Sequence, residues 1–265
     1  MVHADNLVHP DLNRDTAEDY KHAVVSYAGE AVKDLHYAPH SHRRVQLFHI
    51  VSGSVTVATD HGSFVVPPER ALWIPSNVSH AVTYLQHSSL RYLFFRPDAV
   101  RDMPQQPSVI RLTPLLRELI STLLDYPRDA VLDGPASRLV TVILDQLAVQ
   151  PVAPLYLPMP RSHRLRQAVR EAAVDPVKAS RLAAIASRAA LSERSFQRHF
   201  RDETGISFQA WLRQARLMKA VELLSLHLPV GDVAERLGYE SPSAFIAAFR
   251  RAFGVTPARY FAADR

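Results

Sequence analysis

The sequence predicts an α+β chain, in which an antiparallel β domain comes first and a domain built only of helices follows. Three observations support this order. Short β-type runs recur up to residue 95, apolar residues then recur three and four apart, and a pair of helical segments near the C-terminus occurs twice. At 265 residues the chain can bury two ordinary cores, and because it has no cysteine it cannot be held by disulfides.

The β-type runs are short and evenly spaced, which is typical of an antiparallel barrel or sandwich. In order they are AVVSYAG (23–29), RRVQLFHIVSG (43–53), SVTVATDHG (54–62), SFVVPP (63–68), RALWIP (70–75), HAVTYL (80–85) and LRYLFF (90–95). The polar residues 1–20 lack any period and are expected to form an arm. The β domain is therefore placed within residues 21–150.

After Arg96-Pro97 the pattern becomes helical, and the part at about 108–150 carries a wide leucine-rich stripe. Its apolar residues are Leu112, Leu115, Leu116, Leu119, Ile120, Leu123, Leu124, Leu139, Val142, Ile143 and Leu147. Packing within the monomer and pairing with a second subunit both agree with this stripe. The proline-rich run that follows predicts a stiff linker at 151–161, before a helical domain at 162–265.

The stretch from Leu182 to Gly205 has the pattern of a helix-turn-helix. Ser192 is placed to cap the second helix, and Phe196 and Phe200 lie four apart on one face of it. The other face carries the polar residues Arg194, Gln197, Arg198 and Arg201. Arg and Gln have forked groups that match guanine and adenine edges in the major groove, although a solvated surface helix would look the same.

A second copy of this pattern follows 48 or 49 residues later. At an offset of 48, Val233-Ala234 repeats Ile185-Ala186, and Gly238-Tyr239 repeats Ala190-Leu191. At an offset of 49, Phe245, Phe249 and Gly254 repeat Phe196, Phe200 and Gly205. The change of offset predicts one extra residue in the second turn. The helix expected between the copies, about Phe208 to Leu226, spans roughly 27 Å, which suits two recognition helices in successive major grooves about 34 Å apart.

The charge divides between the two parts of the chain. Residues 161–265 hold 18 Lys and Arg against 10 Asp and Glu, a net of +8, whereas residues 1–160 hold 13 against 16, a net of −3. A basic half is expected of a nucleic-acid-binding domain. Binding to a membrane surface is the competing use of basic helices, but it would not need this repeat.

The repeat and its closing run LGYESPSAFIAAFRRAFGVTPARYF (237–261) resemble the DNA-binding domain of AraC/XylS-type transcription regulators over roughly residues 162–261. Carried over from that family, the base-reading positions are Arg194, Gln197 and Arg198 in the first copy and Pro242, Ser243, Ile246 and Ala247 in the second. The second set suits thymine methyls or little contact at all. Arg201, Arg250, Arg251 and Arg259 would then contact DNA as well, the last three at phosphates.

In the β part, His40, His42, Gln46 and Gly53, with His80 further on, resemble the two metal-binding motifs of cupins. His40, His42, Gln46 and Phe48 share parity, so one extended strand would point them to the same side. His40, His42, His80 and Gln46 could hold Ni, Zn, Co, Cu or Fe. The motif's glutamate is replaced by Gln46, and two of its glycines by Asp34 and Asn77, which weakens a metal site.

The same residues can instead line a pocket for an organic effector without a metal. That pocket would use His40, His42, Gln46, Phe48 and His80, with Arg43, Arg44, Trp73 and Tyr92 as further candidates. In both interpretations the N-terminal domain senses a small molecule or metal, and no residue is assigned a catalytic role.

The expected function is that of a transcription regulator that binds double-stranded promoter DNA under effector control. The family resemblance implies a homodimer formed through the 108–150 helices, and RNA polymerase is a further partner if the protein activates transcription. The rival is a metal-dependent cupin enzyme, an oxygenase or isomerase, with an accessory helical domain. Since the sequence shows no signal peptide or membrane-length apolar run, a soluble cytoplasmic protein without a membrane partner is expected.

Overall fold

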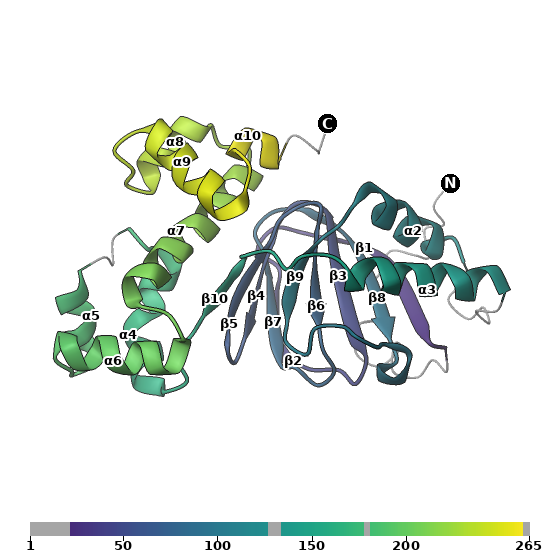
Figure 1. Ribbon diagram of the computed structural model, residues 1–265, viewed down its shortest axis with the longest axis horizontal. Helices are drawn as coiled ribbons and strands as arrows, with labels where there is room; N and C mark the ends of the chain where they lie inside the picture. The colour runs from purple at the N-terminus through teal and green to yellow at the C-terminus, as the bar shows by residue number, and fades with distance from the viewer. Residues whose placement is uncertain (1–21, 127–133, 178–180, 262–265) are drawn as a thin grey trace. The chain divides into compact units, whose positions relative to one another are not determined.

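A computed structural model describes residues 22–126, 134–177 and 181–261 of the chain (Figure 1). The predicted arm at 1–20 lies outside the described residues. The chain forms two compact units. The first contains the described residues up to Val57 and those from Val66 to Pro154, and the second contains Ala58–Val65 and the described residues from Leu155 onward. Among the described residues, no helix has the length and apolar character needed to cross a membrane.

The β part consists of two antiparallel five-stranded sheets in a jelly-roll-like arrangement. One sheet has the order β1 (Val24–Ala31), β8 (Ser88–Phe95), β3 (Val45–Ser52), β6 (Arg70–Ile74) and β9 (Ser108–Arg111). The other has the order β10 (Tyr156–Pro158), β5 (Gly62–Val66), β4 (Val55–Thr59), β7 (His80–Tyr84) and β2 (His36–His40). The prediction of an α+β fold with an N-terminal antiparallel β domain is confirmed.

Two helices cover one face of the first sheet. Val45 and Leu47 on β3 pack in a single apolar cluster with α2 (Pro114–Leu124) and α3 (Gly134–Ala148). Helix α2 begins where Thr113 accepts a hydrogen bond from Leu116 N at 3.2 Å, with a proline in its first turn. The inner residues of the predicted stripe thus pack within the monomer, because the alternation of β3 turns an apolar face toward them.

Three strands depart from the sequence interpretation. The stretch at 108–111 forms β9 on β6, so the helical part begins at Pro114 and not at 108. β2 has no clear sequence signal, because three of its five residues are exposed and none is buried. β10 lies inside the predicted linker, where Pro158 is tolerated because β10 is an edge strand. Trp211 Nε1 donates to Pro158 O at 2.6 Å, which fixes β10 to helix α7.

The second unit contains the helical domain (Figure 1). Its helices are α4 (His163–Val174), α5 (Leu182–Arg188), α6 (Glu193–Thr204), α7 (Phe208–Ser225), α8 (Val230–Arg236), α9 (Pro242–Phe253) and α10 (Pro257–Tyr260). Helix α7 runs from the group formed with α4, α5 and α6 to the group formed with α8, α9 and α10. Its 18 residues span roughly 27 Å, as predicted.

The η3 turn (Pro97–Ala99) follows β8 directly, and Arg96 forms an ion pair with Asp98 at 2.7 Å. This turn leads the chain away from the sheet before it returns as β9.

Candidate nucleic-acid interface and imidazole cluster

The two helix pairs α5–α6 and α8–α9 are built by the same local rules. Ser192 caps α6 by accepting from Ser195 N, and Ser241 caps α9 by accepting from Ala244 N, both at 3.2 Å. Both helices end at a glycine with φ of 78°, Gly205 and Gly254. The predicted repeat at offset 49 therefore extends to both ends of the second helix.

The turns between the paired helices explain the change of offset. Leu191 N donates to Ala186 O, and Tyr239 N donates to Ala234 O, both at 3.0 Å. These bonds lie 48 residues apart, whereas the caps Ser192 and Ser241 lie 49 apart. The one extra residue is therefore inserted after Tyr239, as the sequence predicted.

The buried faces of α6 and α9 are made of aromatic residues. Phe196 and Phe200 are fully buried and pack against Phe208 and Trp211 of α7. Phe245 and Phe249 are equally buried, and Phe249 packs against Tyr260 with ring centroids 5.4 Å apart. Because each helix buries its aromatic stripe, the opposite face of each must point outward.

The outward faces differ. On α6, the exposed residues include Arg194, Gln197, Arg198 and Arg201. On α9, the positions 49 residues later hold Ser243, Ile246, Ala247 and Arg250. Of the eleven predicted DNA-contact residues, ten lie on these two helices and Arg259 lies on α10. At the predicted base-reading positions, forked polar side chains are found only on α6.

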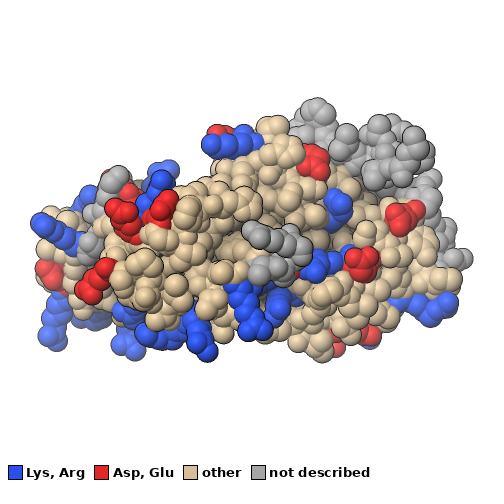
Figure 2. Space-filling view, turned by 90° about the horizontal axis from the view of Figure 1, so that it is seen from above, with Lys and Arg blue, Asp and Glu red and all other residues tan. Residues whose placement is uncertain are grey.

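The part of the chain that the structure describes does not pair the arginines of these faces with carboxylates. Within the described residues, Arg194, Arg198, Arg201, Arg250 and Arg251 form no ion pair with a carboxylate, whereas Arg188 pairs with Glu171 at 2.7 Å. Figure 2 shows Lys and Arg side chains along one edge of the part that holds the second unit's helices. Unpaired guanidinium groups on an exposed face are available to phosphates.

Three imidazoles gather in the β part. The ring centroid of His80 lies 4.3 Å from that of His40 and 5.1 Å from that of His42. His40 and His80 are register partners across β2 and β7. His42 lies in the loop after β2, and its carbonyl oxygen accepts a hydrogen bond from Asn77 N at 2.8 Å. The sequence prediction that these histidines converge is therefore correct.

The explanation of that convergence by a single strand is wrong. His40 ends β2 in one sheet, whereas Gln46 and Phe48 lie on β3 in the other, so no single extended strand carries them. They meet because the chain crosses between the sheets after His40. Asp34, Gly53 and Asn77, the positions compared with the glycines of the cupin motif, all have positive φ. Asp and Asn tolerate this conformation better than most side chains.

Each imidazole has one nitrogen bound to a backbone carbonyl. The Nδ1 atoms of His40, His42 and His80 lie 2.9, 2.6 and 2.9 Å from the carbonyl oxygens of Ala38, Arg44 and Val78. A carbonyl oxygen only accepts, so each Nδ1 carries a proton, and in the neutral ring Nε2 is an acceptor. The three rings are thereby held in the same tautomer.

The metal site at His40, His42, His80 and Gln46 stays a prediction. Among the described residues, no group of three or more His, Cys, Asp or Glu side chains is arranged to hold a metal ion. His42 Nε2 faces the Gln46 side-chain oxygen at 3.1 Å, so either the amide turns its NH₂ group to the ring or the ring is doubly protonated. Gln46 also supplies no negative charge to offset a dication.

Aromatic rings surround the imidazoles. The rings of His42 and Phe94 are 5.3 Å apart, and Phe48 stacks on Tyr92 at 4.9 Å. The hydroxyls of Tyr84 and Tyr92 lie 2.9 Å apart, and burial raises the pKa of both phenols, so both stay neutral. Of the further candidates, Tyr92 belongs to this group, whereas Trp73 packs in the cluster with α2 and α3 and Arg44 donates to the Phe94 carbonyl.

A further histidine carries no motif that would mark it in the sequence. His49 lies on β3 and is 4% exposed, and both its ring nitrogens are buried without a hydrogen-bond partner in the described protein. Its neighbours Arg91 and Arg117 are cationic, and Arg117 pairs with Glu69. Parity places His49 with Val45 and Leu47, away from Gln46 and Phe48, so it does not belong to the imidazole cluster.

Two family models match the chain. One, described as a helix-turn-helix domain, matches residues 185–263, and one described as an AraC-like ligand binding domain matches residues 23–150. The HTH-type transcriptional regulator NimR of Escherichia coli K12 is 35% identical over 253 residues, which cover 95% of this chain and 92% of that protein. The chain belongs to the AraC family of transcription regulators.

Three further matches each cover less of this chain than NimR does. The transcriptional activator RhaR of Pectobacterium atrosepticum is 46% identical over 70 residues, 26% of this chain and 25% of that protein. Among solved structures, ToxT from Vibrio cholerae covers 90% of this chain and 97% of its own at 10% identity and a TM-score of 0.37. The match to the DNA-binding domain of AdpA, solved in complex with a target DNA, covers 38% of this chain and 93% of that one, at 37% identity and a TM-score of 0.36.

As an AraC-family member, this chain is a DNA-binding transcription regulator with an N-terminal ligand-binding domain and a C-terminal helix-turn-helix domain. NimR and RhaR are both named as regulators of transcription and not as enzymes.

Proposed function

We propose that this regulator reads promoter DNA with the unequal outward faces of α6 and α9 and is controlled by an organic effector at the imidazole cluster. The observation that carries the DNA part is the pair of capped helices whose exposed arginines have no carboxylate partner in the described chain. Arg194, Gln197 and Arg198 contact base edges, and Arg201, Arg250 and Arg251 contact phosphates.

Salt dependence tests the DNA part. With about six phosphate contacts, affinity for a selected operator falls on the order of a thousandfold between 50 and 200 mM salt, because bound cations are released from the DNA. The operator is first selected from random duplexes with the full chain, and binding is then titrated over this range. A flat response contradicts the proposal.

The effector part rests on the three fixed tautomers. With each Nδ1 proton donated to a carbonyl, the Nε2 atom of each neutral ring is an acceptor; that of His42 faces the Gln46 side chain, and aromatic rings pack against the cluster. Such a set binds a small organic molecule that carries N–H or O–H donors. His40, His42, Gln46, Phe48 and His80 are assigned to this site, which needs no metal.

A triple variant, His40→Ala, His42→Ala and His80→Ala, tests that assignment. It is expected to retain operator binding through Arg194, Gln197 and Arg198 but to lose its response to effector. Elemental analysis of both proteins at pH 7 accompanies the titrations. Metal present in the wild type and absent from the variant would contradict the metal-free site, and an unchanged effector response would contradict the site itself.

Dimerisation through α2 and α3 is proposed from side chains that the monomer leaves exposed. Leu115 and Val142 are 52% and 41% exposed although neighbouring residues of the same helices are buried. Leu115→Glu is expected to shift the protein toward monomer in sedimentation, while Glu118→Gln on the same helix does not. A cytoplasmic location follows from access to the chromosome, and a contact with RNA polymerase applies if the regulator activates transcription.

A further inference from the structure

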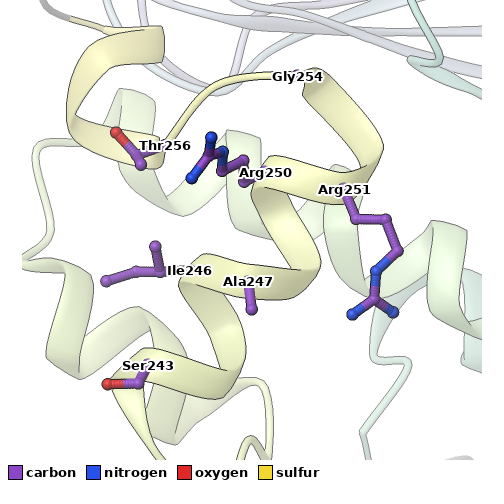
Figure 3. A pocket seen from close by; sticks show the side chains of 7 residues that line it. All are labelled: Ser243, Ile246, Ala247, Arg250, Arg251, Gly254 and Thr256. Carbon is purple, nitrogen blue, oxygen red and sulfur yellow. The ribbon is translucent and has the colours of Figure 1, made fainter.

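The outward face of α9 is hollowed and not convex. An open depression of about 570 Å³ is lined by Ser243, Ile246, Ala247, Arg250, Arg251, Gly254 and Thr256. Figure 3 shows Ser243, Ile246 and Ala247 on successive parts of α9, with the two arginines nearer its Gly254 end. The hollow exists because short side chains stand where α6 has Arg194 and Arg198.

The part of this depression that Ser243, Ile246 and Ala247 line has little hydrogen-bonding capacity. Ile246 and Ala247 offer only methyl and methylene groups, and Ser243 offers one hydroxyl, so the forked contacts that distinguish guanine or adenine are missing. What these groups match in a major groove is the C5-methyl of thymine, the one apolar group that projects from a base edge there.

The charged residues of the lining indicate which partner fits the depression. Arg250 and Arg251 line it, are exposed, and form no ion pair within the described chain. A lining that combines apolar and cationic side chains is complementary to a groove in which methyl groups lie between two phosphate backbones. A neutral apolar peptide would leave both guanidinium groups unused.

We propose that the second helix-turn-helix reads thymine methyl groups, with Ile246 and Ala247 as the residues that determine specificity. The operator then has two chemically different halves. One is read by hydrogen bonds from α6, and the other contains thymines whose methyl groups enter the depression on α9. This inference rests on the proposed role of α9 as a groove-binding element.

Replacement of thymine by uracil tests the inference, because it removes the methyl group and leaves the base-pair hydrogen bonds intact. The full chain is titrated with selected operator duplexes that carry single dT→dU changes. Each methyl that is lost from the α9 half is expected to weaken binding about fourfold, on the order of the 0.8 kcal/mol for one buried methylene-sized group. The operator half that α6 contacts is identified by the base pairs at which the Arg198→Ala variant shows a weaker sequence preference, and the remaining half is assigned to α9.

A variant connects the effect to the residue. In Ile246→Ala, the loss caused by uracil at its partner position is expected to shrink to less than about twofold, because the contact is already gone. Ala258→Ser, an exposed change on α10 outside the depression, keeps the full fourfold loss. Both changes lie outside the buried core, and thermal unfolding of each variant shows that it is folded.

The outcomes separate this inference from the proposed function. Specific, salt-dependent binding that is indifferent to uracil in the α9 half overturns the inference and leaves the DNA-binding role standing. A uracil effect that persists in Ile246→Ala overturns the residue assignment. The absence of any specific DNA binding overturns the proposed function itself. A loss that depends on both the methyl group and Ile246 supports the inference.

Discussion

The two helix-turn-helix units have the same interior and different exteriors. Phe196 and Phe200 in the first and Phe245 and Phe249 in the second are all fully buried, and serine caps and C-terminal glycines recur at the same places. On the outside, Gln197 and Arg198 correspond to Ile246 and Ala247. Packing constrains the inner face of each helix, whereas the outer face faces solvent and is free to diverge. The difference teaches that the repeat preserves the buried phenylalanines, caps and terminal glycines, which together are called the shared frame, whereas the residues that contact DNA differ between the two units.

The largest expected effect tests the shared frame. Phe200→Ala and Phe249→Ala are each expected to lower the free energy of unfolding by about 3–5 kcal/mol, because both remove a fully buried ring. Denaturant unfolding measures the change, and Gln197→Ala on the exposed face of α6 serves as the control, with little effect. A large cost at only one of the two phenylalanines would show that the frames are not equivalent.

The next effect tests the unequal faces. Arg198→Ala is expected to weaken operator binding by about 1–3 kcal/mol and to relax the preference at particular base pairs, because it removes a forked donor from a base edge. Ser243→Ala, in the second unit, is expected to change selectivity little. Titration of operators with single base-pair changes measures both. If Ser243→Ala weakens a base preference as strongly as Arg198→Ala does, base discrimination is not concentrated on α6.

The smallest effect concerns the turns. Ala190 and Gly238 occupy the same place, with φ of 44° and 72°. A side chain is strained in this conformation, so Ala190→Gly is expected to stabilise the protein by about 1 kcal/mol and Gly238→Ala to destabilise it by a similar amount. Among the described residues, a Cβ at 238 would meet Val177 alone, at an ordinary 3.5 Å, so the expected cost is strain in the backbone. Shifts of the same sign in thermal unfolding would contradict this.

Local sequence signals predicted the second unit well. Its caps, buried aromatics and terminal glycines depend on residues close together in the chain, and even the extra residue in the second turn is visible as a change of offset. The proline-rich run was less well predicted, because β10 forms only when Leu157 and its neighbours pair with β5. A three-residue strand has no periodicity of its own.

In the first unit, the errors came from interactions between distant residues. β9 is four residues long, and its pairing with β6 joins Ser108 to Trp73. Parity along a strand assigned His40 and Gln46 to one face, which fails because the chain changes sheets between them. The spacing of His40, His42 and His80 predicted their convergence but could not predict that Gln46 would face His42 Nε2.

His49 gives the first unit a sensitivity to acid that is separate from any effector. Burial, with smaller contributions from Arg91 and Arg117, lowers the pKa of His49 to about 3, whereas an unfolded histidine titrates near 6.5. Between these values the unfolded chain binds a proton that the folded chain does not, so stability falls as pH drops below about 6.5, by up to about 1.4 kcal/mol per pH unit. His49→Leu should remove this contribution. Between pH 7 and pH 5, its free energy of unfolding, measured with denaturant, should therefore fall by about 2 kcal/mol less than that of the wild type. Equal losses in the two proteins would place the acid sensitivity elsewhere. The core beneath α2 thus couples the folding of the ligand-binding domain to the proton concentration around it.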